Sequence, residues 1–179
     1  PPLSLIGVYG PHEGRSIEEK KQFYRDLNKI YEKTSRQIET IAIGDFNVRF
    51  HARREHECTN LGKWVVGRGQ EFMERGENKT SQATNREQCL DWCYQNWLVH
   101  QNSQFQKKNI RKKTTYRELE TAQTNEDITW EKYAEIDHCF SQKKWRNSVT
   151  DIETSMKVLT DSNHYPMIIK CRRKLAEEK

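Results

Sequence analysis

The sequence predicts an α/β fold of two packed mixed β-sheets flanked by helices, and three observations support this class. A strand, a helix and a second strand follow one another at the beginning of the chain, and short strand-like segments fill the part after residue 97. With 179 residues, the chain is long enough to form one domain with its own core. This order of elements is typical of mixed layers rather than of a helical bundle or an all-β barrel.

The first strand and the first helix are marked by local signals. Residues 3–9 are largely apolar and lead into Gly10-Pro11, which is typical of a buried strand followed by a turn. Residues 16–19 resemble a capping box, and apolar residues then recur at helical spacing to about residue 34. The sequence therefore predicts a strand and an amphipathic helix.

The second strand ends in a polar corner. Residues 38–43 lead into Gly44-Asp45-Phe46-Asn47, at the kind of strand end where α/β folds place ligand-binding groups. Residues 48–81 are rich in Gly, Arg, His and Asn and show little periodicity, which predicts a long loop.

The second half of the chain is expected to contain one helix and several strands. Residues 84–87 offer a second capping box, and we expect a helix to about Asn96 with an apolar stripe formed by Leu90, Cys93, Tyr94 and Trp97. Residues 121–127 are expected to form a surface loop. Alternation predicts strands at 98–101, 114–117, 135–140, 149–156 and 165–171.

The composition favours a folded protein with an anionic partner. The formal net charge is +5, and five Trp, seven Tyr and six Phe argue against disorder. A charge run is more often a solvated face than a binding site, so charge alone does not establish nucleic-acid binding. The leading candidates for phosphate contacts are Lys107, Lys108, Arg111, Lys112 and Lys113.

The cysteines and the hydropathy limit the setting. Five cysteines without a C-x-x-C pair do not suggest a disulfide framework, and we expect an intracellular protein. Cys89 and Cys93 are predicted to be core thiols rather than half of a zinc site. No apolar run approaches the roughly 20 residues that span a bilayer, so no membrane partner is expected.

Three segments place acid, amide and imidazole groups at predicted strand ends: 44–47, 135–138 and 162–166. Hydrolysis of a phosphodiester needs a positioned water, a metal or base to activate it, and donors for the charge that builds on the phosphoryl oxygens. Asp, Asn and His supply these functions. Taken singly, each segment is also ordinary turn chemistry.

In this order the segments resemble the endonuclease/exonuclease/phosphatase superfamily, and especially its LINE-type retrotransposon endonucleases of the craniofacial-development-protein-2-like kind. The resemblance rests on five segments. They are LIGVYGP at 5–11, IAIGDFN at 41–47, AEIDH at 134–138, Lys144-Trp145-Arg146 and SNHYP at 162–166. It implies a DNase-I-like four-layer sandwich.

The resemblance also implies roles for single residues. Asp45 would position and deprotonate the attacking water, while Asn47 and Tyr9 would contact the scissile phosphate. His164 would face the phosphate as an imidazolium or as a general base, oriented by Asp137. Without the resemblance, Tyr9 could equally be a buried strand aromatic and Asp137 a turn acid.

The implied cofactor is Mg²⁺, with Mn²⁺ as an alternative, and we expect it to bind weakly. Asn163 stands where the superfamily has an Asp beside the metal, and an amide is a poorer ligand for a hard cation. The superfamily's N-terminal portion, with its Glu ligand, has no counterpart before Pro1. We therefore expect residues 1–179 to form a superfamily domain that lacks its N-terminal portion.

The resulting hypothesis is a retrotransposon-type DNA endonuclease that hydrolyses a phosphodiester bond with Mg²⁺ and has little activity as this chain alone. Its partners would be DNA and a reverse transcriptase domain of the parent polyprotein, and an active enzyme would work in the nucleus. Two alternatives remain open. One is an inactive retroelement remnant that binds nucleic acid without cutting it, and the other is a superfamily phosphatase.

Overall fold

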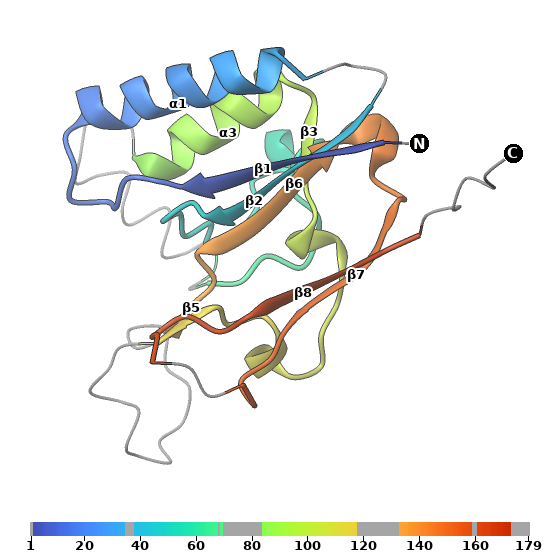
Figure 1. Ribbon diagram of the computed structural model, residues 1–179. Helices are drawn as coiled ribbons and strands as arrows, with labels where there is room; N and C mark the ends of the chain where they lie inside the picture. Colours follow the sequence, from blue (N-terminus) through green and yellow to red (C-terminus); the bar gives the residue numbers. More distant parts are fainter. Residues whose placement is uncertain are drawn as a thin grey trace, which may run out of the picture.

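A four-stranded mixed sheet forms the centre of the molecule (Figure 1). The computed structural model describes residues 2–34, 38–67, 69, 84–117, 133–158 and 161–172. The sheet has the order β1-β2-β6-β3, with β1 parallel to β2 and the other neighbours antiparallel. Its strands are β1 (Leu3–Tyr9), β2 (Glu39–Asp45), β6 (Asp137–Gln142) and β3 (Leu98–His100).

Two helices, α1 (Ile17–Glu32) and α3 (Asn85–Gln95), cover one face of this sheet (Figure 1). Both predicted capping boxes are confirmed, since Ser16 and Thr84 each accept from the backbone three residues later. A large aromatic core, which includes Trp92 of α3, joins the helices to the sheet.

The predicted apolar stripe of α3 is wrong in part. Cys93 is buried as expected, but Tyr94 and Trp97 are each 71% exposed, and Trp92 is buried in their place. The helix ends at Gln95, so Trp97 lies beyond it with a left-handed φ of 54°. Apolar residues occur on more than one side of this helix, so their spacing could not fix which side faces the sheet.

The opposite face of the central sheet packs against a smaller antiparallel sheet of β7 (Val149–Thr154) and β8 (Met167–Cys171). Ile41 and Cys139 of the central sheet contact Val149 and Ile152 of β7 within one apolar cluster. The described residues thus form the predicted α/β arrangement of helices and two packed sheets, although the second sheet is antiparallel rather than mixed. The shorter elements are β4 (Tyr116–Arg117), β5 (Tyr133–Ala134), η1 (Glu55–Glu57), η2 (Asn102–Gln104), η3 (Ile110–Lys112) and η5 (Lys143–Trp145).

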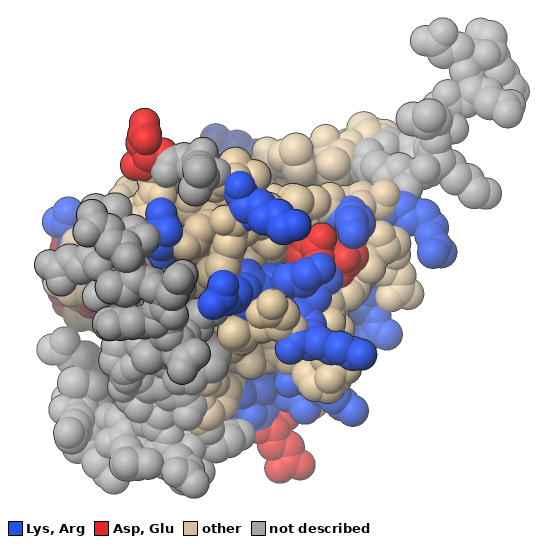
Figure 2. All heavy atoms as spheres, turned by 90° about the horizontal axis from the view of Figure 1, so that it is seen from below, with Lys and Arg blue, Asp and Glu red and all other residues tan. Residues whose placement is uncertain are grey.

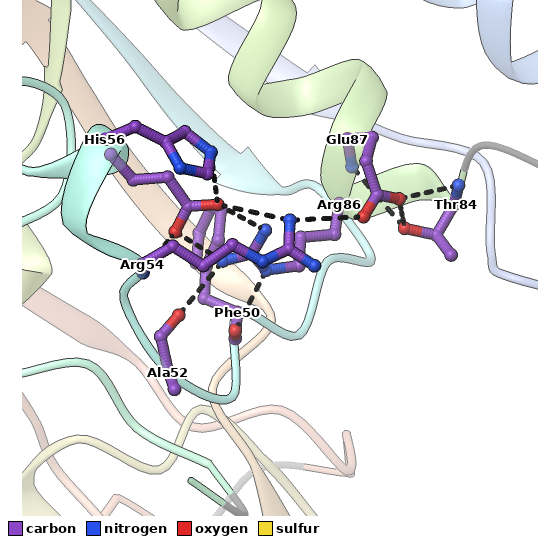
Figure 3. Close-up of polar contacts among 8 residues, drawn as sticks. Phe50, Ala52, Arg54, His56, Thr84, Arg86 and Glu87 are labelled. Carbon is purple, nitrogen blue, oxygen red and sulfur yellow. Dashed lines mark hydrogen bonds and ion pairs between the residues drawn. The ribbon is translucent and has the colours of Figure 1, made fainter. Parts of the chain in front are cut away.

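The loop that follows β2 is held in place by a buried arginine (Figure 3). Arg86 donates from Nε to the carbonyl of Phe50 and from Nη2 to that of Ala52, each at 3.0 Å. Two further bonds of 2.7 Å join its guanidinium to the carboxylate of Glu57. Burial raises the pKa of Glu57, but the bonds from Arg86 and from the backbone of Arg54, together with the charges of both arginines, lower the pKa overall. A bidentate pair of this kind fixes geometry as well as charge.

Other sequence expectations meet the structure only in part. Cys89 and Cys93 are buried, so the prediction of core thiols is confirmed. Within the described ranges, no helix is long and apolar enough to cross a membrane. The expected loop at 121–127, and residues 70–81 of the longer loop, lie outside the residues that the structure describes.

Candidate active site at the strand ends

The sheet topology brings three of the predicted residues to one edge. Asp45 is the last residue of β2 and pairs directly with Asp137, the first residue of β6. Tyr9, the last residue of β1, pairs with Asp45 on its other side. Because β2 and β6 are antiparallel, the end of one strand meets the beginning of the other, and the two carboxylates become neighbours.

His164 reaches the same edge from the segment before β8. The backbone on both sides of His164 is bonded to the segment around β4, since Asn163 accepts from Arg117 and Tyr165 donates to Thr115. His164 Nδ1 lies 2.9 Å from Asp137 Oδ2, and its Nε2 lies 3.9 Å from Asp45 Oδ2. The imidazole therefore stands between two carboxylates, which is the convergence that the sequence motifs predicted.

Asn47 fixes the carboxylate of Asp45. Its backbone adopts a left-handed φ of 52°, which Asn tolerates better than most residues. Its N–H donates to Asp45 Oδ1 at 2.8 Å, and its Nδ2 donates to Asp45 Oδ2 at 3.1 Å and to the carbonyl of Gly10 at 2.9 Å. In this structure the amide of Asn47 thus orients Asp45.

The electrostatics of the site favour a charged histidine beside a basic carboxylate. The hydrogen bond to Asp137 raises the pKa of His164, and the charges of both carboxylates add to this against burial. Burial raises the pKa of Asp45, with Asp137 adding to the effect and the bond from Asn47 opposing it. Perturbed pKa values of this kind are frequent at functional sites.

Two further predicted residues, Tyr9 and Asn163, lie beside the site, but neither side chain is hydrogen-bonded to its carboxylates or to the ring of His164. Tyr9 is 82% exposed, so it is not a buried strand aromatic and its ring is open to a ligand. Asn163 is half-buried and directly precedes His164. Sequence reasoning missed one neighbour, Tyr116, whose ring packs edge-on against His164 with centroids 5.3 Å apart.

The five basic residues proposed for phosphate contacts are not equivalent. Lys113 is buried, and its ammonium donates to the carbonyls of Trp64 and Asn102. The sequence predicted that Lys113 would be available to a phosphate, and its burial corrects this prediction. Lys107 is largely covered and is paired with acids of β7.

Three of the five remain exposed: Lys108, Arg111 and Lys112. Lys112 also contacts Glu153 at 3.0 Å. Figure 2 shows Lys and Arg side chains gathered on the lower face of the molecule, around a small acidic group. Of the five candidates, only Lys108, Arg111 and Lys112 are therefore exposed enough to contact a phosphate.

The carboxylates of the site fit a hard divalent cation. Mg²⁺ is usually held by one or two carboxylates together with water and substrate oxygens, and Asp45 and Asp137 are ligands of this type. Asp137 Oδ2 is already bonded to His164, and a protonated His164 opposes a cation placed between the two carboxylates.

A second group of metal-ligand types lies in the core. His100, Glu135 and His138 have ligand atoms within 4.8 Å of one another. His100 Nε2 lies 2.9 Å from His138 Nδ1, and His138 Nε2 lies 2.8 Å from the carbonyl of Val48. Their ligand types suit a transition metal. However, the ammonium of Lys113 is close enough to lower the pKa of His138, and it would also repel a cation.

No protein-family model matches this chain. It is 27% identical over 173 residues to craniofacial development protein 2 of Bos taurus, a match that covers 97% of this chain and 25% of that protein. The chain thus spans about a quarter of the length of the curated relative.

Solved structures match the fold over almost the whole chain. A 3′-5′ exonuclease from Neisseria meningitidis has a TM-score of 0.60 at 14% identity, covering 93% of this chain and 60% of the other. A 3′ phosphatase from Neisseria, bound to a product DNA hairpin, has a TM-score of 0.59 at 14% identity, covering 94% and 61%. An AP endonuclease from Archaeoglobus fulgidus has a TM-score of 0.56 at 12% identity, also covering 94% and 61%. The chain therefore shares the fold of these exonuclease and endonuclease structures, which is the DNase-I-like fold that its motifs predicted.

Proposed function

We propose that this chain is part of a retrotransposon-type DNA endonuclease that hydrolyses a phosphodiester bond with the help of Mg²⁺. The observation that carries the proposal is His164, held between Asp137 at 2.9 Å and Asp45 at 3.9 Å. Three residues from distant parts of the chain meet there, and together they can move a proton and stabilise a negative charge. The neighbouring structure bound to a DNA hairpin and the order of the motifs support the choice of DNA.

His164 supplies a positive charge to the reaction. Its hydrogen bond to Asp137 raises its pKa, so the ring is more readily protonated than a free histidine. When Nδ1 donates to Asp137, Nε2–H remains to donate to a phosphoryl oxygen. Negative charge on that oxygen grows as the water attacks, and a fixed donor stabilises it most at that point.

Asp45 receives the proton from the attacking water. Burial raises its pKa and makes the carboxylate a stronger base, while Asn47 holds both of its oxygens in a fixed orientation. Tyr9, beside Asp45 in the sheet register, adds an exposed hydroxyl for the scissile phosphate.

A divalent cation bound beside the phosphate would add charge stabilisation for the phosphate and leaving oxygen, while Asp45 acts as the base and Asp137 orients His164. Mg²⁺ is the expected ion and Mn²⁺ the alternative, and binding should be weak because Asn163, at the position that the resemblance assigns to a metal ligand, is neutral.

The DNA partner would be bound mainly through its phosphates. Lys108 and Arg111 are exposed and carry charge without reading base edges, so binding should depend weakly on sequence and steeply on salt. The retroelement hypothesis also predicts a reverse transcriptase in the same polyprotein and a nuclear site of action.

Two other activities of the same fold are separate candidates. A superfamily phosphatase is favoured by the neighbour described as a 3′ phosphatase with bound DNA. A remnant that binds DNA without cutting is favoured by Asn163, which lacks the charge that holds a metal.

One assay separates the three candidates. The complete protein that contains this chain is incubated with supercoiled plasmid and with a 3′-phosphorylated DNA hairpin, in Mg²⁺ and in Mn²⁺. Nicking that is lost in both Asp45→Asn and His164→Ala supports the endonuclease. Release of phosphate without nicking supports the phosphatase, and binding without either product supports the remnant.

Asn163→Asp and Asp161→Asn serve as matched variants. Asp161 is exposed and outside the carboxylate pair, so its replacement should leave nicking unchanged. Asn163→Asp adds a carboxylate beside His164 and should raise the activity at low Mg²⁺. Plasmid nicking that survives in His164→Ala would contradict the endonuclease role.

A further inference from the structure

One buried amide joins the two corners that carry the candidate active site. Asn85, the first residue of α3, is fully buried. Its Nδ2 lies 2.8 Å from the carbonyl oxygen of Pro11, 3.1 Å from that of Phe46 and 3.0 Å from that of Asn47. Pro11 belongs to the corner after β1, and the other two residues form the corner after β2.

The three acceptors determine which end of the amide faces the corners. A carbonyl oxygen only accepts, so the NH₂ group must face all three, with one of its two hydrogens shared. Asn85 Oδ1 is buried and has no hydrogen-bond partner within the part of the chain that the structure describes. A carboxylate at this position would set its lone pairs against three carbonyl oxygens. The site therefore requires an amide donor.

Helix capping does not account for this requirement. Thr84 already caps α3 and forms the capping box with Glu87. The first residue of a helix usually faces solvent, whereas the side chain of Asn85 is buried between loops that are 38 and 74 residues away in sequence. Its contacts are therefore long-range and specific to these corners.

The two corners are also bonded to each other, so a shift in one reaches the catalytic carboxylate. Gly10 N–H donates to the carbonyl of Asp45 at 2.6 Å, and Asn47 Nδ2 donates to the carbonyl of Gly10 at 2.9 Å. A Cβ at Gly10 would come within 2.7 Å of the carbonyl oxygen of Phe46, which shows how closely the corners approach.

We propose that Asn85 is a positioning residue: it holds the corner of Asn47, and through Asn47 it keeps the carboxylate of Asp45 facing His164. The catalytic consequence rests on the proposed function, but the structural consequence does not. Arg86, the next residue, fixes the same loop further along at Phe50 and Ala52. Consecutive residues at the start of α3 thus hold the loop on which the site depends.

The structural test is local hydrogen exchange in the complete protein, measured by mass spectrometry on Asn85→Asp and Asn85→Ala. The matched control is Asn96→Asp at the other end of α3, where Nδ2 of Asn96 donates to Asn28 and to the carbonyl of Trp92. Segments 7–12 and 44–50 should exchange at least about tenfold faster in both Asn85 variants than in the parent, relative to β7. The control should leave both segments unchanged.

Two results would overturn the proposal. One is acceleration of equal size in the corners and in β7, which indicates global destabilisation alone. The other is the same local acceleration in Asn96→Asp. If Asn85→Asp does not fold, Asn85→Ser retains one donor hydrogen and should show a smaller acceleration confined to the same two segments.

The kinetic test separates this inference from the proposed function. If the parent protein cleaves DNA, Asn85→Asp should lower kcat by about 100-fold and change KM little. A displaced catalytic group slows the chemical step but leaves substrate binding nearly the same. An unchanged kcat would overturn the positioning role. A parent protein without cleavage would contradict the proposed function, while hydrogen exchange would still decide the role of Asn85.

Discussion

Two groups that contain histidine are built on neighbouring residues of β6, His164 with Asp137 and His100 with His138, and their environments are opposite. His164 is half-buried against Asp137, whose hydrogen bond raises its pKa. His100 and His138 are fully buried, and burial lowers the pKa of both, that of His138 to about 4. Since consecutive strand residues face opposite sides, Asp137 and His138 direct these two environments to opposite faces. The difference shows that the surroundings, rather than the residue type, identify the histidine suited to catalysis.

The buried pair has a structural explanation. A carbonyl only accepts, so His138 Nε2 carries a proton for Val48, and His138 Nδ1 then accepts from His100. Both rings pack against Phe50, with centroids 4.7 and 4.9 Å apart. The pair therefore anchors the same loop that Arg86 holds from the helix side.

The largest expected effect is on catalysis at His164. Replacing it with Ala should lower DNA cleavage by about 100- to 10,000-fold, because one positioned proton donor contributes that much. The measurement is kcat/KM on plasmid DNA, with His56→Ala as control because the side chain of His56 is 75% exposed and lies outside the site. Equal losses in the two variants would contradict a specific role of His164 in cleavage.

The second largest effect is on stability, where replacing His138 should cost more than replacing His164. His138→Ala should lower the free energy of unfolding by about 3 kcal/mol, since it leaves a cavity and two buried unpaired groups. His164→Ala should cost less than about 1 kcal/mol because its ring is partly exposed. Urea unfolding of both variants measures this. A larger loss for His164→Ala would contradict the assignment of structural and catalytic roles.

Local signals explain what could be predicted from the sequence. The capping boxes at Ser16 and Thr84 depend on residues three apart, so both were readable. Asp45, Asp137 and His164 could be predicted together because the short motifs around them, taken in order, resemble those of a known superfamily, whereas each motif alone is also ordinary turn chemistry.

Long-range contacts explain what could not. The buried position of Lys113 depends on the carbonyl of Trp64, 49 residues away, and its sequence neighbours are exposed lysines and arginines. The pairing of Arg86 with Glu57 spans 29 residues, and the sequence indicated only a helix start there. Nothing in the local spacing distinguishes these residues from solvated ones.

The response to pH should have opposite signs for the two groups. A raised pKa means that His164 contributes stability below its ordinary value of 6.5, and this contribution is lost as the pH rises through the raised pKa. A lowered pKa means that His138 contributes above 6.5, and its contribution is lost as the pH falls towards about 4. The difference in free energy of unfolding between the parent protein and His164→Gln should therefore shrink as the pH rises above 6.5. The corresponding difference for His138→Gln should shrink as the pH falls below 6.5. Urea unfolding across both ranges tests this, and gaps that change in the same direction would contradict it.

The smallest expected effect is on the salt dependence of DNA binding, where exposed and covered basic residues should differ. Exposed Lys108 and Arg111 can release counterions from DNA, and so can Lys112, whose pair with Glu153 is open to solvent. Lys107 is covered and is held by Asp151. Replacing the three exposed residues with Gln should lower the slope of log affinity against log salt by about 2 to 3 units, at about 0.9 per phosphate contact. Lys107→Gln should leave the slope nearly unchanged. Titration of a fluorescent duplex at several salt concentrations measures both, and an equal change in slope for Lys107→Gln would show that its internal ion pair does not withhold it from DNA.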